Sequence, residues 1–202
     1  MQAFKTVSGV VAPMLAANVD TDVIMPKQFL KGIDRSGLDK GVFFDLRFLA
    51  DGKANPEFVL NQQPWVDSCF LVVGPNFGCG SSREHAVWGL KQLGIRALIG
   101  SSFAGIFFDN CQRNGVLLIQ LSEAQIQALG QLAAEGQNAT ISIDLEQQKI
   151  LLHDGRSIEF EIDALRKQSL VLGLDAIGGT LQRSEQINAF EARHLQQNPW
   201  LA

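Results

Sequence analysis

The amino-acid sequence predicts an α/β protein in which helices flank a largely parallel β-sheet, with a small antiparallel part attached. Between residues 68 and 121, apolar runs alternate with amphipathic segments in the order strand, helix, strand, helix, strand. This order is typical of a parallel sheet covered on both faces. Between residues 140 and 162, three short runs of alternating apolar and polar residues are separated by turn residues, which is typical of an antiparallel meander.

The N-terminal part, residues 1–67, is expected to fold as short strands and long loops. It holds four of the six prolines and several Gly, Asp and Asn turn signals. The apolar stretch at 7–17 is interrupted by Gly9 and Pro13, and only Lys5 precedes it. We therefore expect strand and loop there, and no export signal.

The parallel elements are expected in the middle of the chain, where apolar runs of strand length lie at 68–73, 95–100 and 116–121. One helix is predicted over about 83–93 and ends at Gly94. A second begins with Ser102 as its cap and ends at Gly115. The apolar stripes are Ala86, Val87, Leu90 and Leu93 in the first helix, and Ala104, Phe107, Phe108 and Cys111 in the second.

The remaining elements follow from a cap and from alternation. Ser122 and Gln125 match a capping box, so a helix is expected from there to about residue 135. The strands of the meander are expected at 140–146, 149–152 and 157–162. A last helix is predicted to start near Ser184.

Length and composition limit the classes of function. The 202 residues favour one domain that buries a core without disulfides or metal ions. A net charge of -4 and a pI near 5.4, without a basic cluster, argue against a nucleic-acid or anionic-membrane partner. No uncharged apolar run reaches the roughly 20 residues that span a bilayer. We expect a cytoplasmic protein, because the cysteines show no disulfide pattern.

The three cysteines, Cys69, Cys79 and Cys111, form neither a CxxC motif nor a disulfide pattern. We expect reduced thiols. An iron–sulfur cluster usually needs three or four ligands, and only Cys79 lies in a glycine-rich loop. The chain is therefore expected to bind no cluster and no metal of its own.

Residues 74–90, GPNFGCGSSREHAVWGL, place glycines, two serines and an arginine between a predicted strand and a predicted helix. A loop at this position presents unpaired N–H groups and the positive end of a helix dipole, which together bind anions. Gly78 and Gly80 permit tight turns and close approach of a ligand. The guanidinium of Arg83 suits a carboxylate or a phosphate.

Three familiar glycine-loop motifs do not fit this loop. A phosphate-binding P-loop needs a lysine, which is absent. A dinucleotide fingerprint needs glycine where Arg83 stands, and a hydrolase elbow centred on Ser82 needs glycine where Glu84 stands. Ser81 or Ser82 could simply cap the helix. One serine suffices for that, so the dense cluster that ends at His85 indicates function.

His85 leaves a serine hydrolase open as an alternative, with His85 as the base toward Ser81 or Ser82. A helix neighbour is poorly aimed at a loop serine, and no acid partner is identifiable. A structural hydrogen-bonding role is therefore favoured for His85.

Asp20 and Asp22 could bind a metal or form an Asx-type turn before Pro26. The glycine and the later acidic ligand of a calcium loop are absent. Carboxylates in an apolar setting need a partner, and Arg83 is the expected one.

These motifs resemble one known family. Segments 18–26, 74–86 and 102–115 are similar to the small subunits of bacterial 3-isopropylmalate dehydratases (isopropylmalate isomerases), which are similar to the swivelling domain of aconitase. The similarity continues at 163–177 and 190–200 and so covers nearly the whole chain. It implies one swivelling β/β/α domain over residues 1–202, with a C-terminal extension over about 163–202.

The resemblance implies a hydro-lyase of leucine biosynthesis that moves a hydroxyl group between neighbouring carbons of a malate-type acid through an alkene. By the family pattern, Ser81 is the catalytic base and Asp22 pairs with or orients the site. Ser82 and Arg83 bind substrate carboxylates. The Lewis acid is a [4Fe-4S] cluster held by a separate large subunit, so the chain is expected to work only in a heterodimer or larger assembly.

The resemblance also places residues 28–33 against the variable group of the substrate. Apolar residues there suit an isopropyl group better than an extra carboxylate, although they would also serve as ordinary core, and Lys31 keeps an acidic substrate possible. The expected contact residues are Gln28, Phe29, Leu30, Lys31 and Ile33. The alternatives are a small subunit of a homoaconitase or methylmalate-type hydro-lyase, a stand-alone serine hydrolase, and a non-catalytic anion-binding module.

Overall fold

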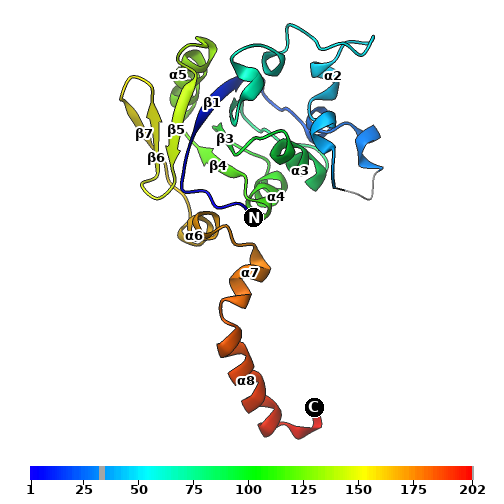
Figure 1. Ribbon diagram of the computed structural model, residues 1–202, viewed down its shortest axis with the longest axis vertical. Helices are drawn as coiled ribbons and strands as arrows, with labels where there is room; N and C mark the ends of the chain where they lie inside the picture. Colours follow the sequence, from blue (N-terminus) through cyan, green and yellow to red (C-terminus); the bar gives the residue numbers. More distant parts are fainter. Residues whose placement is uncertain (32–34, 202) are drawn as a thin grey trace.

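The computed structural model describes residues 1–31 and 35–201. Within them, one sheet has the strand order β4-β3-β2-β1-β5-β6-β7 (Figure 1). Its strands are β1 (Thr6–Met14), β2 (Phe70–Val73), β3 (Ala97–Gly100), β4 (Leu117–Gln120), β5 (Thr140–Asp144), β6 (Lys149–Leu152) and β7 (Ser157–Glu159). Pairs from β4 to β1 are parallel and pairs from β1 to β7 are antiparallel. The predicted α/β class is confirmed, although the antiparallel part is as large as the parallel one.

Strand β1 belongs to both halves of the sheet. Residues 11–14 pair in parallel with β2, and residues 6–10 pair antiparallel with β5. The prediction of strand and loop at 7–17 is therefore confirmed. Because β1 and β2 run in the same direction, the loops that leave their carboxyl ends, residues 15–20 and 74–83, lie at the same edge of the sheet.

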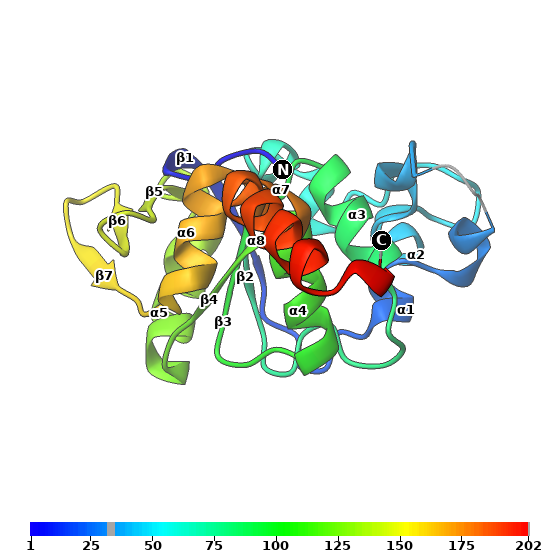
Figure 2. The same ribbon diagram turned by 90° about the horizontal axis from the view of Figure 1, so that it is seen from below.

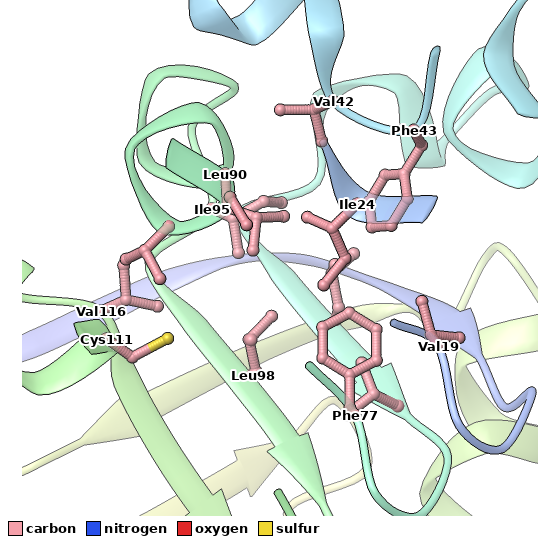
Figure 3. Packing of buried hydrophobic residues seen from close by; sticks show 14 of the residues in the cluster. Val19, Ile24, Val42, Phe43, Phe77, Leu90, Ile95, Leu98, Cys111 and Val116 are labelled. Atoms are coloured by element: carbon pink, nitrogen blue, oxygen red, sulfur yellow. The ribbon is translucent and has the colours of Figure 1, made fainter. Parts of the chain in front are cut away.

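Helices cover both faces of the parallel half. Along β2, Leu71 and Val73 point into one buried cluster, and Phe70 and Val72 point into another, as the two-residue period of a strand requires. The first cluster, shown in Figure 3, packs against α3 (Glu84–Gln92) and α4 (Gly105–Asn114). The second packs against α5 (Glu123–Ala134) and α6 (Ala164–Leu172). Each buried Leu, Ile or Phe contributes about 1.5–3 kcal/mol of transfer free energy.

The segment between β1 and β2 folds as short helical turns, so the expectation of further short strands there is wrong for its described residues. Prolines and phenylalanines explain this: Phe29 packs on Phe44 with ring centroids 5.0 Å apart, and Phe43 on Phe58 at 5.9 Å. Side chains rather than a backbone ladder therefore hold the segment. Its elements are α1 (Thr21–Ile24), η1 (Lys27–Leu30), η2 (Leu38–Gly41), α2 (Phe44–Arg47), η3 (Val59–Asn61) and η4 (Trp65–Asp67).

The C-terminal helices leave the body of the protein. In Figure 1, α7 (Ala176–Leu181) and α8 (Ser184–Gln197) run from α6 away from the sheet; in Figure 2, seen from below, α8 lies obliquely in front of the rest of the protein. The last described element is η5 (Pro199–Leu201). The start of α8 at Ser184 confirms the prediction, whereas α7 was not predicted. Neither α7 nor α8 has a buried residue. None of the described helices has both the length and the apolar content needed to cross a bilayer.

One predicted cap is confirmed and another is wrong. Ser122 and Gln125 form the complete capping box of α5. Ser102 does not cap α4, whose N-cap is Ala104 without a side-chain hydrogen bond. The Ser102 hydroxyl instead accepts the N–H of Asn76 at 2.9 Å. It therefore ties the loop after β3 to the loop after β2.

Candidate active site

The two motifs that the sequence singled out lie side by side, because they follow the adjacent strands β1 and β2. Asp20 and Cys79 form a parallel β-bridge. The N–H of Gly78 donates to the carbonyl of Val19 at 2.8 Å, and the N–H of Thr21 donates to the carbonyl of Cys79 at 2.8 Å. The backbone thus fixes the aspartate segment against the glycine loop.

Gly78 allows this loop to lie close to α4. Its φ of +79° is in the left-handed region, and a β-carbon there would overlap the ring of Phe107. Any other residue would therefore push the loop away from α4. Gly80 also has a positive φ, +90°, and the chain then turns outward to expose Ser81 and Ser82.

Arg83 and Asp22 form the expected ion pair. The guanidinium nitrogen Nη1 of Arg83 lies 2.5 Å from Oδ1 of Asp22, and the side chains are 13% and 42% exposed. The hydrogen bond from Arg83, with the charges of Arg83 and Lys27, holds the pKa of the Asp22 carboxyl below its usual value of 3.8. Asp22 therefore stays ionised at neutral pH and holds the guanidinium in place.

The two aspartates have different tasks. Asp20 is the N-cap of α1, where its carboxylate accepts the N–H of Val23 at 2.8 Å. It thereby positions Asp22 in the first turn of that helix. No group of three or more His, Cys, Asp or Glu residues in the described part of the chain could hold a metal ion.

Ser81 and Ser82 do not cap α3, so that interpretation is wrong. The N-cap is Arg83, and it makes no side-chain cap hydrogen bond. The serines lie one and two residues too early to reach the first turn. Neither hydroxyl forms a hydrogen bond with another described residue, while the carbonyl of Ser81 accepts the hydroxyl of Thr21 at 2.8 Å. The backbone is fixed and the hydroxyls are free.

A cavity of about 130 Å³ opens beside these serines. One part of its wall is the glycine loop with Arg83, and another part is the start of α4. The lining residues are Thr21, Gly78, Gly80, Ser81, Ser82, Arg83, Ala104, Gly105, Ile106, Phe107 and Asn110. The α4 wall was not predicted from the sequence. With Ser102 expected as the cap of this helix, the sequence carried no signal for an open helix start at Ala104.

His85 does not contact the serines. Its ring packs on Trp88 with centroids 4.8 Å apart, and no hydrogen bond joins it to another described residue. The expected hydrogen-bonding role is therefore wrong, and the nucleophile–base contact of a serine hydrolase is absent from this structure. His153 lies in the turn after β6.

Most of the predicted specificity residues lie on η1, beside this site but outside its cavity. Phe29 and Leu30 pack against the first core cluster, while Gln28 and Lys31 are exposed. None of the four lines the cavity, and Ile33 lies outside the described residues. Their contact with a substrate stays a prediction.

The three thiols are free. Cys111 is buried, and burial raises the pKa of its thiol well above the usual value. Burial also raises the pKa of Cys69. The Cys79 thiol lies 3.5 Å from the carbonyl oxygen of Asn18, so it belongs to the contact between the two motif segments.

Comparisons with known protein families cover almost the whole chain. Residues 1–124 match the model described as "Aconitase C-terminal domain", and residues 127–164 match "LeuD_N". Residues 177–202 match the model for the C-terminal domain of the 3-isopropylmalate dehydratase small subunit.

Individual relatives agree with these families. The chain is 61% identical over 201 residues to "3-isopropylmalate dehydratase small subunit 1" of Mannheimia succiniciproducens, covering 100% of this chain and 99% of that one. It is 51% identical to the small subunit of Rhodospirillum rubrum, with 100% and 97% covered. A crystal structure titled 3-isopropylmalate dehydratase (leuD), from Methanocaldococcus jannaschii, is 25% identical with a TM-score of 0.67, covering 92% of this chain and 99% of that one. The chain therefore belongs to the family of 3-isopropylmalate dehydratase small subunits.

Proposed function

We propose that this chain, together with a large subunit, interconverts 2-isopropylmalate and 3-isopropylmalate through 2-isopropylmaleate in leucine biosynthesis. Family membership over the full length supports the reaction. The observation that carries the site is that Ser81 and Ser82, both exposed and without hydrogen bonds from their hydroxyls among the described residues, stand at a cavity beside the Arg83–Asp22 ion pair. This is where an anionic substrate would meet a base.

Dehydration requires removal of a weakly acidic proton next to a carboxylate. We assign this step to Ser81 in its deprotonated form: the alkoxide oxygen takes the proton and becomes a hydroxyl, the C–H electron pair becomes the second bond of the alkene, and the C–O bond breaks with loss of hydroxide. Rehydration reverses these steps with hydroxide at the neighbouring carbon. A serine oxygen can act as a base only if its negative charge is stabilised. The open N-terminus of α3 and the guanidinium of Arg83 are suited to that task.

Arg83 and Ser82 are assigned to a substrate carboxylate. Asp22 occupies Nη1 of the guanidinium, which leaves other N–H donors of Arg83 for a ligand. Because the fork is planar, the pairing with Asp22 also sets the plane in which a carboxylate is bound. Asp22 is thus a positioning residue. The segment 28–33 is assigned to the variable group of the substrate.

The large subunit is proposed to carry a [4Fe-4S] cluster, which as a Lewis acid would take up the departing hydroxide. Residues 1–202 are proposed to form one swivelling domain with an extension over about 163–202. Within that extension, α6 packs on the core through buried Leu170, whereas α7 and α8 have no fully buried residue. We place the protein in the cytoplasm, where free thiols persist.

The test is co-expression of this chain with the iron–sulfur large subunit encoded in the same genome, followed by anaerobic purification. Nuclear magnetic resonance would follow conversion of 2-isopropylmalate to the 3-isomer, with each subunit alone and with homocitrate as control substrate. We expect turnover of isopropylmalate by the pair only. Turnover by this chain alone, or none by a pair with an intact cluster, would contradict the proposal. Ester hydrolysis by the single chain would favour the serine hydrolase.

A further inference from the structure

Asn110 is a buried polar residue without a partner. It is 7% exposed, yet no hydrogen bond joins its side-chain amide to another described residue. Its amide atoms are not among the fully enclosed polar atoms that lack a partner, and the residue lines the cavity beside Ser81, Ser82 and Arg83. Because these atoms keep some exposure and the residue lines the cavity, the amide faces open space rather than packed protein. The cavity is therefore where its partner belongs.

One turn further along the same face of α4, Asn114 has hydrogen-bond partners for its side-chain amide. Asn114 donates to Oε1 of Glu84 at 2.7 Å and accepts the indole N–H of Trp88 at 3.0 Å. These bonds join α3 to α4. Residues 110 and 114 share a face because four residues make about one turn. Asn110 therefore points toward the start of α3, where the protein supplies no partner.

The start of α4 adds further free donors. Its N-cap is Ala104, and the first N–H bonded within the helix is that of Phe108. The N–H groups of residues 105–107 have no backbone or side-chain acceptor among the described residues. Gly105, Ile106 and Phe107 line the same cavity as Asn110. Helix starts of this kind favour negative charge.

We propose that Asn110 is a substrate-binding residue: its Nδ2–H group donates to one carboxylate of a dicarboxylate ligand, held between the starts of α3 and α4. This rests on the proposed function for the identity of the substrate. The cavity of about 130 Å³ is roughly ten times the ~10–15 Å³ that one water molecule requires, so it can take a carboxylate group. Arg83 and the start of α4 both line it.

An asparagine suits this position better than a charged residue. A second arginine or lysine would repel Arg83, and an aspartate would compete with the ligand for Arg83. A neutral amide donates one hydrogen bond and leaves the charge balance to Arg83 and Asp22.

The test uses the complex of both subunits and malonate as a simple dicarboxylate probe. Isothermal titration calorimetry would measure the Kd of malonate, and steady-state kinetics would measure KM and kcat for 2-isopropylmalate. For Asn110→Leu we expect Kd and KM to rise about tenfold or more with little change in kcat, since one hydrogen bond to a charged group is lost. Asn110→Asp should raise both constants further, because it sets a carboxylate against a carboxylate.

Thermal unfolding separates this role from a structural one. Removing an unpaired buried amide should leave the midpoint of the Asn110→Leu complex unchanged or higher, whereas loss of a structural hydrogen bond would lower it. The matched control is Gln112→Leu, which removes an amide from the same helix. Because Gln112 lines a different cavity, the Gln112→Leu complex should bind malonate as the wild type does. If the Asn110→Leu chain fails to assemble with the large subunit, the same measurements on the isosteric Asn110→Asp variant test the role of Asn110.

The outcomes distinguish the two proposals. Equal malonate affinity in wild type and in both Asn110 variants, or no binding by the wild type, would overturn the role of Asn110 whether or not the complex isomerises isopropylmalate. Malonate binding that depends on Asn110, in a complex without isomerase activity, would reject the proposed function and support the subsite.

Discussion

Three helices of this protein follow parallel strands at the same edge of the sheet, and they start in two different ways. The start of α5 is closed by its own side chains: Oε1 of Gln125 accepts the N–H of Ser122 at 3.0 Å, and Oγ of Ser122 accepts the N–H of Gln125 at 3.3 Å. α3 and α4 start at Arg83 and Ala104 without a side-chain cap.

The difference between capped and uncapped starts shows where the fold leaves backbone N–H donors free. A side-chain cap stabilises a helix by about 1 kcal/mol, so the two open starts each forgo that stabilisation. Both line the same cavity, which Ser81 also lines. Of the three helices, the two with open starts therefore line the site, and the one with a closed start does not.

The largest expected effect is that of Ser81→Ala, which removes the proposed base from the cavity at the two open helix starts. In the reconstituted complex kcat should fall by about 10²–10⁴-fold, the range of general-base catalysis. The stability of the chain should stay within about 0.5 kcal/mol, because the residue is exposed and its hydroxyl makes no hydrogen bond among the described residues. Ser8→Ala, on β1 at an exposed Ser8–Ser142 contact, is the matched control. Wild-type turnover by Ser81→Ala would remove the assignment.

Arg83→Lys should have the next largest effect. It keeps the charge but loses the planar fork that contacts Asp22 and has further donors for a carboxylate. We expect kcat/KM to fall roughly 10- to 100-fold, the value of one or two hydrogen bonds to charged groups. Arg156→Lys is the control, because Arg156 forms an ion pair with Asp154 at 2.6 Å in the turn before β7, away from the cavity. Equal losses in both variants would indicate a general effect of arginine removal.

Closing the start of α4 tests the comparison directly. Ala104 has extended φ and ψ of −66° and 135°, which an N-cap residue adopts. Ala104→Asp should stabilise the chain by about 0.5–2 kcal/mol and raise KM for 2-isopropylmalate about tenfold, because its carboxylate would occupy the free N–H groups. Chemical denaturation and steady-state kinetics would measure the two effects.

The reverse change at the closed start is the control. Ser122→Ala should destabilise the chain by about 1 kcal/mol and leave KM unchanged. A stabilised Ala104→Asp variant with wild-type KM would show that the start of α4 is not used by the substrate.

The sequence predicted one local part of this site, the glycine loop, and one long-range contact, the pair of Asp22 and Arg83, which are 61 residues apart. The glycine loop was recognised from its spacing, and the Asp22–Arg83 pair from the need of a carboxylate for a cation. The contribution of Asn110 was not predictable, because it depends on β3 lying next to β2 and on the angle between α3 and α4. The prediction of Ser102 as a helix cap was wrong for a similar reason, because its hydroxyl makes a tertiary hydrogen bond with the N–H of Asn76 instead.

The smallest expected effect concerns how the stability of the folded chain changes at acidic pH. The pKa of Asp22 is lowered in the folded chain, so the ionised carboxylate stabilises the fold above the pKa of the unfolded chain, near 3.8. This contribution is lost as the pH falls through the lower, folded-state pKa. The difference in denaturation midpoint between wild type and Asp22→Asn should therefore be constant from about pH 7 to about pH 5 and should disappear well below about pH 4. The carboxylate is 42% exposed, so solvent screens the pair and the difference should be small.

A difference that disappears already near pH 6, or persists unchanged at about pH 2, would show that the stability of the chain does not depend on the ionisation of Asp22. In that case the ion pair orients Arg83 for the ligand without contributing to the fold.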